Sequence, residues 1–239
     1  MTVINPELSP SRAGSLPLVA DDLALDFANT ESGRGFPSHQ NHLREAANVV
    51  DWLRHAKALR AEEADWLKKR ISERADLAQD LLAQAIALRA AIHDIGAALG
   101  RRAKPPEAAL AGLSALHARF VAKAELAPGV LSCRWLWSVR AAPVEAALGP
   151  IALAAVKLFT EGDFHRIREC GGHACGWLFY DLSKNNRRRW CEMEVCGNRA
   201  KQRRLRARRE KAETGFSQEG ARNQGPLEPA AIRPNRGRL

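Results

Sequence analysis

C-G-G-H-A-C at residues 170–175 and C-E-M-E-V-C at residues 191–196 are two matched cysteine pairs within one short stretch of the chain. The sulfur donors are Cys170, Cys175, Cys191 and Cys196. A tetrahedral zinc site holds four such ligands about 2.3 Å from the metal, and two short loops can each supply two of them. Four thiolates leave no open coordination position for a substrate or a water. The spacing therefore predicts a structural zinc site, with Zn²⁺ as the cofactor, and not a catalytic one.

The segment between the two pairs predicts a hairpin. W-L-F-Y at residues 177–180 is typical of a strand, D-L-S-K-N-N supplies turn residues, and Arg189 and Trp190 would begin a return strand. We call the two cysteine loops, residues 170–175 and 191–196, the first and second knuckle. A knuckle, a hairpin and a second knuckle that leads into a helix predict a small treble-clef-like zinc finger. Such a unit is too small to be stabilised by burial alone, so the metal would supply much of its folding free energy. We expect His173 to be a turn residue, because its closeness to Cys175 hinders joint ligation; replacement of one cysteine ligand is the alternative.

The formal net charge of +10 is concentrated in one part of the 239-residue chain. Residues 184–211 contain twelve Lys and Arg against three Asp and Glu, whereas residues 1–169 contain twenty-one against twenty. A protein that is basic in one segment only is typical of binding to a polyanion through that segment.

The run R-A-K-Q-R-R-L-R-A-R-R at residues 199–209 predicts a helix that begins directly after the second knuckle. Like charges three and four residues apart repel one another in a free helix, and a phosphate backbone would replace this repulsion with attraction. We therefore predict a nucleic acid as the partner, and the alternative is a solvated charged tail. Both DNA and RNA stay open at this point, because arginine-rich segments also fold on RNA. The predicted nucleic-acid-binding residues are Arg187, Arg188, Arg189, Arg199, Lys201, Arg203, Arg204, Arg206, Arg208 and Arg209.

Apolar residues upstream of the cysteines repeat with helical spacing, which predicts a mostly helical domain. The expected helices cover residues 23–30, 41–59, 61–99, 105–120 and 143–159. For the first of these a strand is the alternative, because Leu23, Leu25 and Phe27 alternate with other residues. L-S-C-R-W-L-W-S-V-R at residues 131–140 is aromatic and alternating, so it predicts a strand in a small hairpin, with Cys133 as a buried small hydrophobe.

These patterns divide the chain into four parts. Residues 1–17 are expected to form a flexible arm, residues 18–166 a helical domain, residues 167–211 the finger with its basic helix, and residues 212–239 a disordered tail. The predicted fold class is mainly α: a helical N-terminal domain with a minor β element, followed by the small treble-clef-like zinc finger.

Cysteine usage and hydropathy predict a cytoplasmic protein with no membrane partner. The odd number of cysteines, five, and the metal-like spacing of four of them argue against a disulfide framework. The first ten residues lack the basic and apolar regions of a secretory signal. The apolar stretch at residues 141–159 is interrupted by Pro143, Glu145, Pro150 and Lys157, which we interpret as unsuited to spanning a bilayer.

One polar cluster lies beside glycines in the helical domain. Asp26, Asn29, Thr30 and Arg34 are candidates for a pocket that binds a small-molecule effector, and the alternative is that they cap and turn the chain. The sequence contains no Ser-His-Asp order, no paired-carboxylate motif and no H-E-x-x-H, so we predict that the protein is not an enzyme and assign no catalytic residue. A small-molecule-binding or interaction protein, with the finger as a docking module, is the alternative to a nucleic-acid-binding protein.

The motif C-G-W-L-F-Y-D-x-S-x-N-x-x-R-R-W-C-x-M-x-x-C-G-N-R-x-K, which begins at Cys175, resembles the CGNR zinc finger, named after the four residues found here at 196–199. L-A-L-D-F-A-N-T at residues 23–30, followed by helices, resembles the stress-response domain called ABATE. Together the resemblances cover residues 18–211. They imply a bacterial transcription regulator whose four cysteines hold zinc, whose finger contacts DNA and whose helical domain senses a signal or ligand. A homodimer that reads two half-sites would suit so small a finger.

Overall fold

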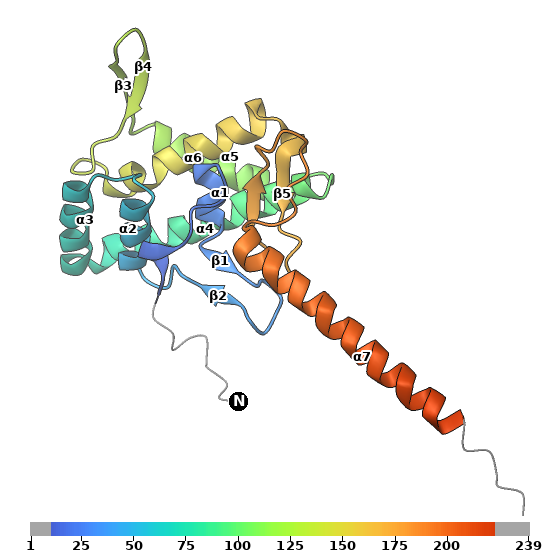
Figure 1. Cartoon of the computed structure of the whole chain (residues 1–239). Coiled ribbons are helices and arrows are strands. Elements are labelled where there is room, and N and C mark those ends of the chain that lie inside the picture. The colour runs from blue at the N-terminus through green and yellow to red at the C-terminus, as the bar shows by residue number, and fades with distance from the viewer. Residues whose placement is uncertain (1–10, 223–239) are drawn as a thin grey trace, which may run out of the picture. The chain divides into compact units, whose positions relative to one another are not determined.

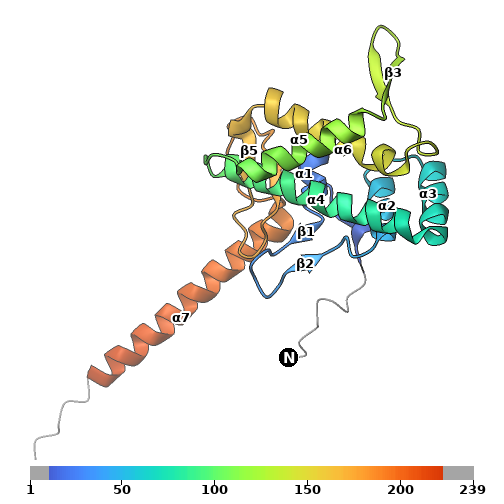
Figure 2. The same cartoon turned by 180° about the vertical axis from the view of Figure 1, so that it is seen from behind.

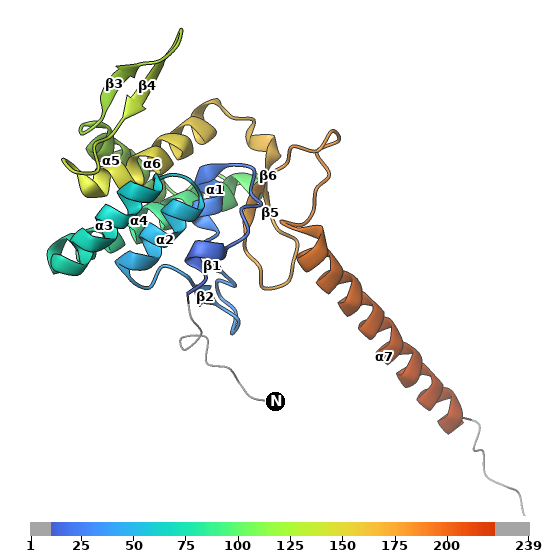
Figure 3. The same ribbon diagram turned by 60° about the vertical axis from the view of Figure 1, so that its left-hand side comes forward.

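The computed structural model describes residues 11–222, so the first ten residues of the expected arm and residues 223–239 of the expected tail lie outside it. The chain divides into two compact units after Gly197. We call the described part of the first unit, residues 11–197, the body; the second unit begins with helix α7 (Asn198–Arg222). Figure 1 labels the α-helices of both units and the strands of the body except β6, which Figure 3 labels.

The body is mainly helical, as the sequence predicts, and its described strands form three two-stranded antiparallel sheets. Its α-helices are α1 (Leu23–Ala28), α2 (Ala46–His55), α3 (Ala61–Glu73), α4 (Ala75–Gly100), α5 (Glu107–Val121) and α6 (Pro143–Glu161). The sheets pair β1 (Glu31–Ser32) with β2 (Gln40–Asn41), β3 (Glu125–Pro128) with β4 (Cys133–Leu136), and β5 (Ile167–Glu169) with β6 (Leu178–Tyr180). Three shorter turns are η1 (Ala13–Ser15), η2 (Phe164–Arg166) and the π-helical η3 (Met193–Gly197).

Helices α1, α4, α5 and α6 pack against one another at the centre of the body, as the view from behind also shows (Figure 2). Helix α1 begins at Asp22, whose carboxylate accepts hydrogen bonds from the backbone N–H groups of Ala24 and Leu25 and so caps the helix. Phe27 of α1 is fully buried and packs edge-on against Trp52 of α2, with ring centroids 5.0 Å apart. The short helix predicted from this part of the sequence is therefore confirmed.

The single helix predicted over residues 61–99 is wrong, because the chain breaks at Arg74 into α3 and α4. The backbone of Arg74 is extended, with φ −132° and ψ 98°. The break lets Leu67 and Ile71, on the buried face of α3, lie beside α2, while α4 packs against α1, α5 and α6. A helical period that continues through the break in the sequence does not reveal this change of axis.

Helices α4 and α6 are long and apolar enough to cross a membrane by length and composition alone. In the most apolar window of each, 56% and 50% of the residues are buried inside the protein, as expected for core helices. Both pack against several other helices of the body. We therefore describe them as core helices, the position that the sequence predicts for residues 143–159.

Strands β3 and β4 form a hairpin that extends from the rest of the body in all three views (Figures 1–3). This hairpin confirms the strand predicted within residues 131–140. The prediction that Cys133 is buried is wrong, because Cys133 and the other three residues of β4 are exposed. An aromatic, alternating strand indicates core packing, but here the strand lies outside the core.

The ends of the described chain carry more structure than the expected arm and tail. Ala13 and Leu16 are buried, and η1 packs against α2. At the other end, α7 continues to Arg222, past residue 212, where the tail was expected to begin.

Candidate metal centre and basic helix

The Sγ atoms of the four predicted zinc ligands all lie within 4.8 Å of one another. The sulfur of Cys191 lies 3.7 Å from that of Cys175 and 3.6 Å from that of Cys196. Four ligands 2.3 Å from a tetrahedral zinc lie about 3.8 Å from each other, so the observed spacing fits the ion. Cys175 is half-buried and the other three cysteines are buried. The four-cysteine cluster is a zinc-binding site.

The first cysteine pair lies in the turn of a hairpin that the sequence did not predict. Strand β6 pairs with β5, which precedes Cys170, and not with a return strand at residues 189–190. The N–H group of Cys170 donates to the carbonyl of Trp177 at 2.8 Å, which closes the hairpin behind the metal loop. The carbonyl of Arg189 accepts instead from Gly171, at 2.9 Å, and this bond joins the two knuckles.

Backbone groups support the sulfur atoms of the cluster. The N–H groups of Gly172 and Cys191 point at the Cys170 sulfur from 3.4 and 3.2 Å. A Cβ atom on Gly172 would lie 3.1 Å from the Cys196 sulfur and 3.3 Å from the Cys170 sulfur. Glycine at this position therefore leaves room for the sulfurs and lets the backbone orient one of them.

The four sulfurs compete for protons when no cation lies among them. Hydrogen bonds with the neighbouring cysteines, Cys175 first, lower the pKa of Cys170, whereas the hydrogen bond with Cys170 raises the pKa of Cys175. Contact with Cys170 and Cys175 raises the pKa of Cys191 as well. The pKa values of the four cysteines are thus shifted in opposite directions, with that of Cys196 also lowered, and a divalent cation is what allows all four to be deprotonated together.

His173 lies in the first knuckle but outside the group of sulfurs. Within residues 11–222, the clustered ligand atoms near this loop belong to the four cysteines. The His173 ring lies against Phe36, with ring centroids 5.2 Å apart. This contact and its position in the loop favour the expected role of His173 as a turn residue over a role as a metal ligand.

Strand β6, which belongs to the finger, packs in the core of the body. Leu178 and Phe179 are fully buried. The side-chain amide of Asn29 donates to the Leu178 carbonyl, and the Leu178 N–H donates back to the Asn29 Oδ1. Gly96 of α4 provides space for this strand, because a Cβ atom there would lie 2.7 Å from the Leu178 Cδ1. The finger is therefore held by the helical body as well as by its metal.

A second connection links the body directly to a zinc ligand. The N–H group of Gly33, in the loop between β1 and β2, donates to the carbonyl of Cys175 at 2.9 Å. Gly33 has φ +66°, and a Cβ atom there would lie 2.8 Å from the Ser38 carbonyl oxygen, so the turn requires glycine. The β1–β2 loop therefore braces the first knuckle.

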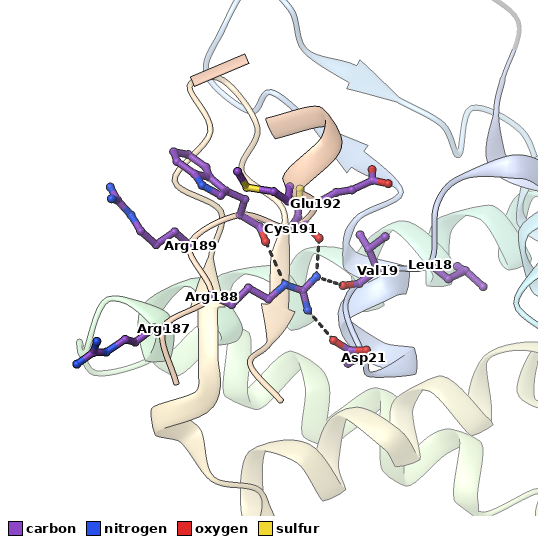
Figure 4. Close-up of a pocket in the computed structure, with 10 residues that line it drawn as sticks. Leu18, Val19, Asp21, Arg187, Arg188, Arg189, Cys191 and Glu192 are labelled. Atoms are coloured by element: carbon purple, nitrogen blue, oxygen red, sulfur yellow. Dashed lines mark hydrogen bonds and ion pairs between the residues drawn. The ribbon is translucent and has the colours of Figure 1, made fainter. Parts of the chain in front are cut away.

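Arg188 makes a set of internal contacts, although the sequence placed it among the residues that bind nucleic acid (Figure 4). Its guanidinium donates to Asp21 and to the Val19 carbonyl, both at 2.6 Å. It also donates to the carbonyls of Trp190 at 3.0 Å and Cys191 at 2.5 Å. These contacts tie the second knuckle to the segment before α1, and they occupy four of the five N–H groups with which the guanidinium could bind a phosphate.

Figure 4 shows Arg187 and Arg189 directed away from the contacts of Arg188. Both side chains are exposed, and the Arg189 guanidinium lies 5.4 Å from the centre of the Trp190 ring. Of the three consecutive arginines, the structure thus leaves the outer two available at the surface of the body and uses the middle one inside it.

The four candidate pocket residues have separate partners within the chain. Asp26 accepts a hydrogen bond from the backbone of Ala20, and Thr30 donates to the carbonyl of Phe27. Arg34 contacts Glu31 at 2.7 Å, and Asn29 joins β6 as described. Burial raises the pKa of Asp26 to about 6, against the lowering effect of its backbone hydrogen bonds. These contacts fit the capping and turning role; an effector pocket at these residues stays a prediction.

A buried charge cluster lies next to this region, and sequence reasoning missed it. Arg89 of α4 is buried and contacts the Glu31 carboxylate at 3.0 Å and Asn41 at 2.7 Å. Glu31 also contacts His39 at 2.7 Å. Burial alone would raise the pKa of Glu31, but His39, Arg89 and Arg34 outweigh it and the pKa is lowered. The available signal was an arginine within an otherwise apolar stretch, since a buried arginine needs a partner.

The second unit begins with the predicted basic helix, α7. Its first turns carry seven of the predicted nucleic-acid-binding residues: Arg199, Lys201, Arg203, Arg204, Arg206, Arg208 and Arg209. All seven side chains are exposed, and so is Leu205. The helix has no apolar stripe, because its charges are distributed around the whole circumference at 100° per residue.

Family models match two successive parts of the chain. Residues 21–162 match the ABATE model, described as "Putative stress-induced transcription regulator", and residues 166–209 match the CGNR zinc finger. These are regulator and zinc-finger families and not enzyme families. A comparison with curated proteins finds no match. The ABATE model covers more than half of the chain, and the chain therefore belongs to this family and carries a CGNR zinc finger after the ABATE region.

Proposed function

We propose that this protein is a cytoplasmic, zinc-stabilised transcription regulator that binds DNA through helix α7. The observation that carries the proposal is the charge of α7: seven exposed cationic side chains lie within the eleven residues from Arg199 to Arg209. These residues span about 15 Å of helix axis at 1.5 Å per residue. Duplex DNA carries about nine phosphates over the same length, so the two charge densities are comparable.

The distribution of charge around α7 favours binding of this helix in a groove of the DNA. A helix that lies on a flat surface needs charge on one face, whereas α7 is charged on all faces. The major groove is about 12 Å wide, admits a helix and has phosphates along both walls. A helix in this groove can direct arginines to both walls at once, which replaces the repulsion between neighbouring arginines with attraction.

Arg187 and Arg189 provide a second candidate contact, on the body. Both are exposed, and they flank the internally bonded Arg188. We infer that they bind phosphates and hold the body on the duplex, because contacts of this kind position a protein without reading its sequence. Arg188 is assigned to the body and not to DNA.

Zinc has a structural role in this proposal. The ion holds the second knuckle, which ends at Cys196 and Gly197 directly before α7 begins. Four sulfur ligands leave no open coordination position for hydrolysis. The ABATE region, which shares its core with β6, is the proposed sensor of the inducing signal, in keeping with the description of its family.

Salt-dependent binding tests the proposal. We would measure the Kd of the zinc-loaded full chain for mixed-sequence duplex DNA between 50 and 200 mM salt. If six phosphates are neutralised, the affinity falls by about a thousandfold over this range. Replacing Arg203, Arg204 and Arg206 by Gln should reduce the slope of log K against log salt by about 2.7.

The matched control replaces three exposed lysines of the body, Lys57, Lys69 and Lys123, by Gln. This variant has the same net charge as the α7 variant and should keep the wild-type slope. Equal slopes for both variants would show that α7 is only a charged tail. Competition with structured RNA at one salt concentration completes the test, because stronger binding to RNA would favour the alternative partner.

A further inference from the structure

The hairpin β3–β4 has an apolar face to which the described body adds no covering layer. The register places Leu126 opposite Trp135 and Pro128 opposite Cys133, so these four side chains share one face of the hairpin. Leu126 is 62% exposed and Trp135 is 42% exposed. An isolated two-stranded hairpin is only marginally stable in water, and both of its strands have free edges. Such a hairpin is typical of a surface that is covered by a partner.

The tip of the hairpin is also apolar, against the usual chemistry of a turn. Val130 and Leu131 occupy the turn and are 95% and 103% exposed. Leu131 has φ +58°, a backbone conformation for which glycine or asparagine is preferred. A leucine here is unfavourable both for the backbone and for its exposed side chain, unless the side chain is buried by a partner.

A groove that could receive such a tip lies at the base of the same hairpin. It has a volume of about 640 Å³, and its lining includes Leu59, Trp135, Pro150, Leu153 and Ala154. Trp135 belongs both to the groove and to the apolar face of the hairpin, so the two surfaces are continuous. One chain therefore carries an apolar projection and an apolar groove side by side.

We propose that these two features form a homodimer interface. Two copies pack the apolar faces of their hairpins together in antiparallel orientation, and the Val130–Leu131 tip of each enters the groove of the other. Each strand has four residues and spans about 13 Å, so the tip of one hairpin reaches the base of an antiparallel neighbour. A twofold axis forms both contacts at once, because each copy supplies both surfaces.

The apolar character of the tip favours a second copy as the occupant. The tip G-V-L-S at residues 129–132 is uncharged, so it enters an apolar groove without desolvating an ion. At the rim, Arg60 is paired with Glu63 at 2.9 Å and the other cations are Arg134 and Lys157. These three cations are exposed, so they can stay in solvent while the tip packs against the apolar part of the lining, which includes Leu59, Leu153 and Ala154.

Sedimentation velocity of the zinc-loaded full chain, from about 1 to 100 µM, tests the proposal without DNA. The expected result is a dimer that Leu131→Glu weakens by at least tenfold in Kd. Leu153→Lys, in the groove, should weaken it similarly. Mixing the two variants should restore dimers, because the Glu tip then meets the Lys groove while the other tip and groove are unchanged. Leu182→Glu, at another exposed leucine of the body, is the matched control and should leave the dimer intact.

Leu131 is fully exposed, so its replacement should leave the fold unchanged, which thermal unfolding checks. If Leu153→Lys lowers the melting temperature, Val130→Glu takes its place as the second single variant. A wild-type chain that is monomeric at 100 µM overturns the proposal. A dimer that is insensitive to both Leu131→Glu and Val130→Glu also overturns it, since the interface then lies elsewhere.

Discussion

Asn29 and Leu178 pair their polar groups across 149 positions of the chain: the Asn29 side-chain amide and the Leu178 backbone exchange two hydrogen bonds of 2.8 Å. Both residues are buried. Asn29 belongs to the ABATE region and Leu178 to the zinc finger. This pair makes a strand of the finger part of the core of the helical body.

Asn29→Ala should lower the free energy of unfolding by about 2–4 kcal/mol, because it leaves a buried N–H and a buried C=O of Leu178 without partners. Urea unfolding of the zinc-loaded protein measures the change. Asn185→Ala, at an exposed position, is the control and should be neutral within about 0.5 kcal/mol. Equal effects of the two substitutions would contradict the assigned role of Asn29.

Removing zinc should destabilise the helical body and not the finger alone. Leu178 and Phe179 share the core with the helices, so a loss of about 4 kcal/mol from the finger would lower the single melting temperature by about 10 °C. Circular dichroism at helical wavelengths, with and without a chelator, measures this. Re-addition of zinc controls for damage by the chelator. A helical transition that stays at the same temperature would show that the two parts unfold independently.

Arg188→Ala should destabilise the body by about 2–3 kcal/mol, because four hydrogen bonds to Asp21 and to three backbone carbonyls are lost at a partly buried site. Arg187→Ala and Arg189→Ala should leave the stability within about 0.5 kcal/mol and weaken DNA binding instead. Thermal unfolding and DNA titration of the three variants separate the two roles. The assignment fails if all three variants lose DNA affinity equally at unchanged stability.

Asp26 should make stability fall as the pH rises from about 4 to 6. Its pKa is raised from 3.8 to about 6 by burial, so in this window the folded state holds a proton that the unfolded state has lost. The stabilisation is fully present below pH 4 and lost above pH 6, and amounts to about 2–3 kcal/mol. Asp26→Asn should remove this dependence. The difference between variant and wild type, measured by urea unfolding at each pH, cancels the acid sensitivity of the zinc ligands.

The zinc ligands and the principal helices could be predicted because their signals are local. The spacing of the cysteines and the period of the apolar residues lie within short windows of sequence. Strand β5 was missed because it has three residues, of which only Ile167 is apolar, and it is defined by its pairing with β6. The break at Arg74 was missed because the apolar period continues through it.

The roles of individual polar residues were harder to predict, because they depend on partners far away in the sequence. Arg188 belongs to a run of three arginines, and nothing in that run distinguishes it from its neighbours. Its partner Asp21 is 167 positions away. Cys133 has the surroundings of a core residue in the sequence, yet lies on an exposed hairpin. In each case the fold decides the role of the side chain.

The placement of β6 also bears on how this protein could be rebuilt by recombination. The two family matches meet between residues 162 and 166, and by these bounds alone this junction is the place to exchange one finger for another. The compact unit, however, continues through this junction to Gly197. A transplanted finger would arrive without the Asn29 amide and the space beside Gly96 that its strand requires. The unit of exchange is therefore the ABATE region together with its finger, and the segment that can be shuffled separately is the basic helix that follows.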